Sequence, residues 1–212
     1  LFSDEVSIGV TNLDSYIFFR PSKRIDLKIN PGDGAFYGPK LDFKLTDCLS
    51  RVWQCGTIQL DMNLPERFDI TYVDDKGEKV RPVMLHRVIF GSIERFIGIL
   101  IEHFAGVFPL WLAPVQIKVL PVNNEYHLDY AKEVTELLQK NGFKVEMDAR
   151  EEKLGYRIRE GQMEKVPYLL VLGNNERDEK TVTYRKHGQQ KQITVPFDEF
   201  VTMLNQQIKN KE

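Results

Sequence analysis

Residues 166–172 read Val-Pro-Tyr-Leu-Leu-Val-Leu. A short run that is apolar without alternation is typical of a strand buried on both faces of a sheet. Around this run the sequence alternates between strand and helix patterns. We expect further strands at 115–122, 143–148, 181–184 and 192–195, and helices at 126–141, 153–165 and 197–209. This order predicts an α/β domain of about 100 residues with a mixed sheet.

Short strand patterns precede this domain. Residues 41–45 and 57–61 alternate apolar and polar side chains, and a hairpin is predicted to join 70–73 to 80–85. Residues 16–19 are a further strand candidate. Apolar residues three and four apart predict a helix over 93–104, with Ser92 as its N-cap. We place the domain boundary after Pro114, which gives domains 1–114 and 115–212.

The composition is that of a globular protein, with 42% hydrophobic and 28% charged residues. No apolar run reaches the ~18 residues that a membrane span requires, and the first residues lack a signal-peptide pattern. Lys and Arg number 13 against 15 Asp and Glu in residues 1–115, and 16 against 16 in the rest. Any nucleic-acid-binding surface must therefore be a local patch. Because Cys48 and Cys55 match neither a zinc motif nor a redox pair, we expect a cytoplasmic protein with structural thiols.

Three segments of the first half carry polar side chains at informative positions. Residues 36–40 place Tyr37 and Lys40 around a tight turn, which suits either a ligand contact or an ordinary turn. Thr57 and Gln59 share one face of a predicted strand, so that face is either solvated or lines a polar pocket. Residues 86–95 run from a strand through a glycine into a helix N-terminus, a geometry that presents backbone N–H groups to an anion.

In the second half, Arg150, Lys153 and Arg157 are predicted to share a helix face near Arg159. They suit either an RNA-binding patch or a solvated surface paired with neighbouring glutamates.

Read together, several strings resemble the threonyl-tRNA synthetase family over roughly residues 30–212. They are Gly-Ala-Phe-Tyr-Gly-Pro-Lys (34–40), Gln-Cys-Gly-Thr-Ile-Gln-Leu-Asp (54–61), Met-Leu-His-Arg (84–87), Gly-Ser-Ile-Glu-Arg-Phe-Ile-Gly (91–98), Trp-Leu-Ala-Pro-Val-Gln (111–116), Lys-Leu-Gly-Tyr-Arg-Ile-Arg-Glu (153–160) and Val-Pro-Tyr (166–168). The resemblance implies the last part of a class II catalytic domain, built on an antiparallel sheet with motif 3 at 91–95, followed by a mixed-sheet α/β anticodon-binding domain. The implied activity is that of a threonine–tRNA ligase, which uses ATP with magnesium to attach threonine to its tRNA.

The resemblance also assigns residues to roles. It implies that ATP is bound by Gln54, Thr57, Ser92 and the catalytic Arg95; threonine by Tyr37, Lys40 and Gln59; a zinc ion by His86; and tRNA by Arg150, Glu151, Lys153, Arg157 and Glu176. Complete members of the family form homodimers.

The sequence also departs from the family pattern. Nothing matches motifs 1 and 2 or the other two zinc ligands, so we expect a truncated or split product with little activity in isolation. A stretch around residues 16–25 resembles a segment that lies further upstream in the family. Glu151 stands where the family commonly has Asn, and Tyr184 where Arg is expected. The alternative function is a non-catalytic remnant that binds tRNA or a partner.

Overall fold

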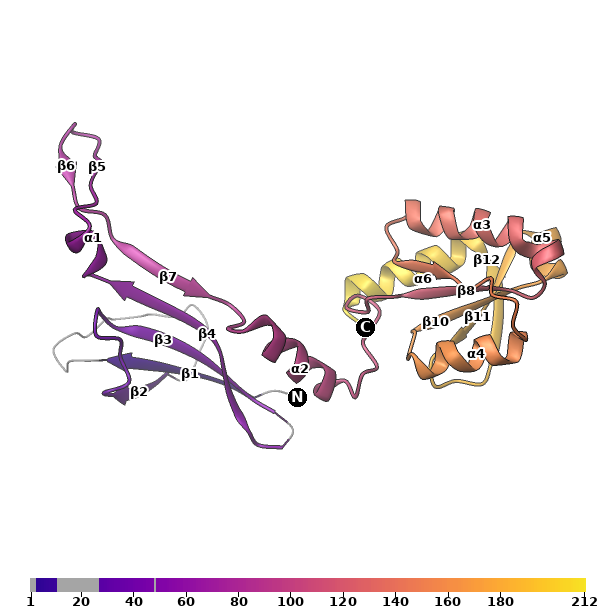
Figure 1. The fold of residues 1–212 in the computed structure, drawn as a ribbon, viewed down its shortest axis with the longest axis horizontal. Helices are drawn as coiled ribbons and strands as arrows, with labels where there is room; N and C mark the ends of the chain where they lie inside the picture. The colour runs from indigo at the N-terminus through magenta and orange to yellow at the C-terminus, as the bar shows by residue number, and fades with distance from the viewer. Residues whose placement is uncertain (1–2, 11–26, 48) are drawn as a thin grey trace. The chain divides into compact units, whose positions relative to one another are not determined.

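The structure is a computed structural model that describes residues 3–10, 27–47 and 49–212 (Figure 1). The chain divides into two compact units, Leu1–His103 and Phe104–Glu212. The strand candidate at 16–19, the upstream-like stretch at 16–25 and Cys48 lie outside the described residues. No helix within the described ranges is both long and apolar enough to cross a bilayer.

The first unit is built on a five-stranded sheet with the order β2-β1-β3-β4-β7. All neighbouring strands are antiparallel except β1 and β2, in agreement with the expected antiparallel architecture. The strands are β1 (Ser3–Val10), β2 (Leu27–Pro31), β3 (Lys40–Thr46), β4 (Val52–Asp61) and β7 (Met84–Val88). The strand patterns at 41–45 and 57–61 correspond to β3 and β4.

The predicted hairpin forms, but its second strand is shorter than expected. β5 (Tyr72–Val73) pairs with β6 (Lys79–Val80), and the chain then leaves the ladder before β7 begins. Pro82 lies in the break, and proline has no N–H to donate to a neighbouring strand. A short helix, α1 (Leu64–Arg67), which the sequence patterns did not predict, follows β4.

Helix α2 (Ile93–His103) forms as predicted, yet its apolar stripe faces outward in this chain. Ile93, Ile97 and Ile101 are 63%, 47% and 47% exposed, whereas Ile99 on another face is buried. The four-residue spacing places the three exposed isoleucines one above another, so they form a continuous apolar stripe.

The second unit contains the predicted mixed sheet, with the order β12-β11-β10-β8-β9. β8 is parallel to β9 and β10, and β11 is antiparallel to β10 and β12. The elements are β8 (Ile117–Pro121), α3 (Asn124–Lys140), β9 (Val145–Met147), α4 (Leu154–Met163), β10 (Tyr168–Leu172), α5 (Asn174–Glu179), β11 (Thr181–Lys186), β12 (Gln192–Pro196) and α6 (Phe197–Asn210). Only α5 was missing from the sequence-based prediction.

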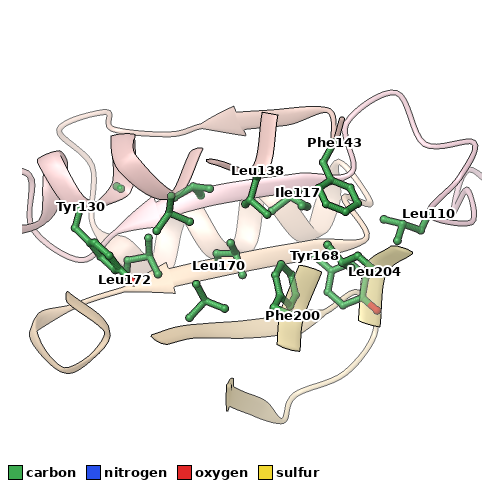
Figure 2. Packing of buried hydrophobic residues seen from close by; sticks show 14 residues of the cluster. Leu110, Ile117, Tyr130, Leu138, Phe143, Tyr168, Leu170, Leu172, Phe200 and Leu204 are labelled. Atoms are coloured by element: carbon green, nitrogen blue, oxygen red, sulfur yellow. The ribbon is translucent and has the colours of Figure 1, made fainter. Parts of the chain in front are cut away.

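Two apolar clusters cover the two faces of this sheet. Alternate side chains of β8 and β10 pack with α3 and α6 in the larger cluster, which includes Ile117, Leu170 and Phe200 (Figure 2). The intervening side chains, Leu120 and Leu169, pack against α4 on the opposite face. Because successive side chains of a strand point to opposite faces, the apolar run at 166–172 is buried on both sides.

The segment between α2 and β8 packs with the second unit. Leu110 belongs to the larger cluster, and its N–H donates to the carbonyl of Glu212 at 3.1 Å. The buried Gln116 donates its amide to the Leu110 carbonyl and accepts from the N–H of Lys144, both at 2.8 Å. These contacts explain why the compact units divide ahead of the boundary expected after Pro114.

Candidate functional site

Strand register gathers polar side chains on one face of the first unit's sheet. Lys40 of β3 lies opposite Gln59 of β4, which lies opposite His86 of β7. In the neighbouring row, Asp42 lies opposite Thr57. Residues two apart on a strand share a face, so all five side chains belong to one polar surface.

A pocket of about 400 Å³ lies at one end of this surface. The Tyr37 hydroxyl donates to Oε1 of Gln59, and Nε2 of Gln59 lies 3.4 Å from Oγ1 of Thr57. The pocket is lined by Phe36, Tyr37, Gln59, Asp61, Asn63, Leu64, Arg67 and His86. Tyr37, Gln59 and His86 bring hydroxyl, amide and imidazole groups to its lining, a combination that suits a small polar ligand.

His86 is held in place by a buried carboxylate. Its Nε2 lies 2.8 Å from Oδ2 of Asp61, and Oδ1 of Asp61 accepts the N–H groups of Asn63 and Leu64 at 2.8 and 2.9 Å. Burial by itself would raise the pKa of Asp61, but these hydrogen bonds outweigh burial and lower it. The pairing leaves Nδ1 of His86 as the ring nitrogen available to a ligand.

The residues that the structure describes do not fit a zinc site by themselves. No group of three His, Cys, Asp or Glu side chains within the described ranges is placed to hold a metal ion. A catalytic zinc ion usually takes about three protein ligands, whereas among the described residues the metal-binding side chain that contacts His86 is that of Asp61.

Sequence reasoning missed Asp42, which links two predicted site residues. Its side chain is fully buried, with Nζ of Lys40 at 3.0 Å and Nε2 of Gln54 at 2.8 Å from its two oxygens. Burial lowers the pKa of Lys40, but Asp42 and then Asp33 outweigh burial and raise it. Part of the signal was present in the sequence, because Asp42 belongs to the predicted strand 41–45, which begins directly after Lys40.

The predicted glycine turn from a strand into a helix N-terminus forms after β7. Gly91 adopts a φ of +67°, and α2 begins two residues later. Nη2 of Arg95 donates to the carbonyl of Gln54 at 3.0 Å, so the guanidinium group lies beside β4. Oγ of Ser92 is 3.4 Å from the N–H of Arg95 and donates to the Glu94 carboxylate at 2.9 Å. The structure therefore brings Gln54, Ser92 and Arg95 together.

In the second unit, both arginines among the predicted RNA-contact residues have protein partners. Arg150 donates Nε and Nη2 to the carboxylate of Asp148 at 2.9 and 2.7 Å, and also binds Glu160. These hydrogen bonds lower the pKa of Asp148 against the effect of burial. Arg157 is 3% exposed and donates to three backbone carbonyls. The burial of Arg157 does not favour a direct contact with RNA.

The other predicted contacts are arranged around the carboxyl ends of the strands. Glu151 and Lys153 are exposed in the loop between β9 and α4. The carboxylate of Glu176 in α5 accepts the Gly173 N–H at 2.8 Å and the Thr183 hydroxyl at 2.6 Å. The segment 148–160 carries four Asp or Glu residues and four Lys or Arg residues, so it presents no net positive charge.

Tyr184 lies on the core face of β11. Its ring packs against Tyr168 and Phe200, with centroids 5.6 and 5.2 Å away, and its hydroxyl lies 3.6 Å from Sδ of Met203. Because side chains alternate along a strand, the adjacent Arg185 belongs to the opposite face. Arg185 therefore places a cation one residue after Tyr184, the position where the family pattern has an arginine.

Known families match both halves of the chain. The family described as "tRNA synthetase class II core domain (G, H, P, S and T)" matches residues 7–104, and the family "Anticodon binding domain" matches residues 116–207. Threonine–tRNA ligase of Clostridium novyi is 57% identical over 187 residues, which are 88% of this chain and 29% of that protein. The Fusobacterium nucleatum enzyme is 61% identical over 178 residues, which are 84% of this chain and 28% of that protein.

A solved structure agrees with these matches. The RNA-binding domain of threonyl-tRNA synthetase from Cryptosporidium parvum superposes with a TM-score of 0.79 at 35% identity, covering 97% of this chain and 55% of that one. The chain spans less than a third of the length of the ligases that it matches. Together with the polar surface and the mixed-sheet unit, these similarities show that the chain belongs to the threonyl-tRNA synthetase family.

Proposed function

We propose that this chain supplies the C-terminal part of a threonine–tRNA ligase. In this proposal residues 1–114 are the end of the class II catalytic domain, and residues 115–212 bind the anticodon arm of the tRNA. The observation that carries the proposal is the polar sheet surface, because it gathers Tyr37, Gln59 and His86 in one pocket. Family membership supports the same assignment.

The pocket chemistry favours threonine over a side chain of the same shape without a hydroxyl. Tyr37, Gln59 and His86 line the cavity with side chains that carry polar atoms. A threonine hydroxyl offers these atoms a donor and an acceptor, whereas valine leaves polar groups without a partner. A site built to bind a hydroxyl rejects the analogue that lacks it far more strongly than an apolar pocket does.

The residues proposed to bind ATP lie on β4 and at the N-terminal end of α2. In the proposed first step, a carboxylate oxygen of threonine attacks the α-phosphorus of ATP, and pyrophosphate leaves. Arg95, Ser92, Gln54 and Thr57 would bind the nucleotide, with the Arg95 guanidinium stabilising negative charge that develops on the phosphates. Magnesium would enter with ATP. In the second step a ribose hydroxyl of the tRNA attacks the threonyl carbonyl, and AMP leaves.

The second unit is proposed to bind tRNA through its carboxyl-end loops. Arg150, Glu151, Lys153 and Glu176 come from the loop after β9 and from α5. Ligands of open α/β sheets commonly bind beyond the carboxyl ends of the strands. The absence of net charge in 148–160 predicts weak, salt-sensitive binding rather than a strongly attractive surface.

A direct test titrates chain 1–212 with a tRNA carrying a threonine anticodon and with an unrelated tRNA, at several salt concentrations. Tighter binding of the threonine tRNA supports the proposal, and equal affinity for the two argues against it. Threonine-dependent ATP–pyrophosphate exchange is measured alongside. We expect none from the chain alone, because it spans about 29% of its relatives' length. Exchange that Arg95→Ala abolishes would contradict that expectation.

The second candidate is a non-catalytic remnant that binds tRNA or a partner. The observation that favours it is the pairing of Arg150, a proposed tRNA contact, with two carboxylates of the protein. The reading frame upstream separates the two candidates, because an in-frame motif 1 and motif 2 would supply the rest of an active site. Homodimer formation and a cytoplasmic location remain part of the first proposal. Sedimentation of the longer product would test the dimer.

A further inference from the structure

Arg157 occupies an unusual position for a charged side chain. It projects from α4 into the interior and is 3% exposed. Its Nη2 donates to the Pro121 carbonyl at 2.8 Å, its Nη1 to the Asp148 carbonyl at 2.7 Å and its Nε to the Glu152 carbonyl at 3.2 Å. One guanidinium group thus joins the end of β8 to both ends of the loop that follows β9.

That loop, residues 148–153, carries three of the residues proposed to bind RNA, Arg150, Glu151 and Lys153. Arg157 fixes the loop backbone at Asp148 and Glu152, on either side of Arg150 and Glu151. Asn124, at the start of α3, fixes the intervening position through a hydrogen bond from Nδ2 to the Ala149 carbonyl at 2.6 Å. The Asp148 carboxylate in turn binds Arg150. The loop is therefore held from inside by Arg157 and Asn124, whereas Arg150, Glu151 and Lys153 of the loop are exposed.

We propose that Arg157 is a positioning residue for tRNA recognition, which holds the 148–153 loop in its RNA-binding shape without contacting RNA itself. This inference rests on the proposed RNA-binding function of the second unit. The planar guanidinium group can donate hydrogen bonds to three carbonyls in different directions at once. A lysine ammonium keeps the charge but cannot reproduce that geometry.

A positioning role and a phosphate contact predict different results. A residue that contacts phosphate displaces counterions from the tRNA on binding. Its loss therefore lowers the slope of log affinity against log salt concentration by roughly 0.7–0.9. A positioning residue leaves that slope unchanged and changes affinity and discrimination instead. Lysine binds phosphate as a point charge, so Arg157→Lys would rescue a contact but not the fork geometry.

The experiment compares wild-type chain 1–212 with Arg157→Met, Arg157→Lys and the matched control Arg159→Met, an exposed arginine on the same helix. Affinity for the two tRNAs is measured between about 50 and 200 mM salt, and amide hydrogen exchange is followed across 148–153. We expect both Arg157 variants to bind the threonine tRNA at least about tenfold more weakly, with an unchanged salt slope and faster loop exchange. Arg159→Met should leave loop exchange unchanged.

Two outcomes overturn the inference directly. A lower salt slope in Arg157→Met with rescue by lysine would make Arg157 a phosphate contact. Unchanged tRNA binding by folded Arg157 variants would make its role purely structural. If Arg157→Met does not fold, Asn124→Ala tests the same loop by removing only the bond to Ala149, and unchanged exchange and discrimination would count against the inference. A wild type that binds neither tRNA at low salt refutes the proposed function itself.

Discussion

Replacing Gly161 by alanine should destabilise the second unit, although alanine is the better helix former. Gly161 lies in α4 where the helix approaches β10. A Cβ at this position would lie 2.7 Å from Cδ2 and 3.3 Å from Cδ1 of Leu169, which is 1% exposed. Leu169 is packed on all sides and has little room to move away.

The magnitude follows from two opposing effects. Carbon atoms pack best about 3.5–4.0 Å apart, so the contact at 2.7 Å requires a shift of about 1 Å between helix and strand. Overpacking of this kind costs about 1–3 kcal/mol, whereas glycine to alanine inside a helix gains up to about 1 kcal/mol. We therefore expect a net loss of about 1 kcal/mol, or roughly 4–8 °C in the Tm of a unit of this size.

Gly155 provides the matched control in the same helix. A Cβ added to Gly155 would meet no atom of another element within 4 Å, and the residue is exposed. Gly155→Ala should be neutral or slightly stabilising. Urea unfolding of chain 1–212 measures both variants, and amide exchange in β10 reports on the second unit specifically. If Gly161→Ala stabilises this unit as much as Gly155→Ala does, then α4 is not in tight contact with the sheet and our account of this packing is wrong.

Three further predictions concern charged groups. Burial would raise the pKa of Asp47, but hydrogen bonds from Trp53, Arg51 and Leu49 outweigh it and lower the pKa to about 2. Asp47 therefore stabilises the fold when the pH is above the pKa that this carboxyl has in the unfolded chain. This stabilisation is lost as the pH falls through about 2. Fluorescence of Trp53 during acid titration should show this loss, and Asp47→Asn should remove the transition. In tRNA titrations, Glu151→Asn should increase discrimination by the chain more than overall affinity, because an amide supplies a donor in place of a repelling carboxylate; unchanged discrimination would contradict the proposed role of this position. Metal analysis of the chelator-washed chain should find less than one zinc per chain, and stoichiometric zinc that His86→Ala removes would refute this.

Much of the local structure could be predicted because it depends on near neighbours in the sequence. The spacing of apolar residues predicted the positions of β3, β4, α2 and nearly every element of the second unit. Helix α5 was missed because Asn174–Glu179 is entirely polar and buries no residue, so no periodicity marks it. The predicted strand at 80–85 failed at Pro82, where the missing N–H interrupts the ladder.

The candidate site could be predicted only in part. Family strings identified Tyr37, Gln59, His86 and Arg95, and the structure places the first three in one pocket. The partners of these residues were less accessible to sequence reasoning. Asp61 holds His86 from 25 positions away in the chain, and Asp42 meets Gln54 across a β-bulge between Phe43 and Lys44.

The sequence by itself determined the family, the order of helices and strands, and the residues that carry polar groups, because these follow from local patterns and motif strings. Only the tertiary structure decided what those groups do. Arg150 and Arg157 look alike as cations seven residues apart, yet one is exposed between two carboxylates and the other is buried against carbonyls of Pro121, Asp148 and Glu152. Burial and pairing depend on segments that come together only when α4 packs across β8 and β10, and a local sequence pattern does not show which distant segments will meet.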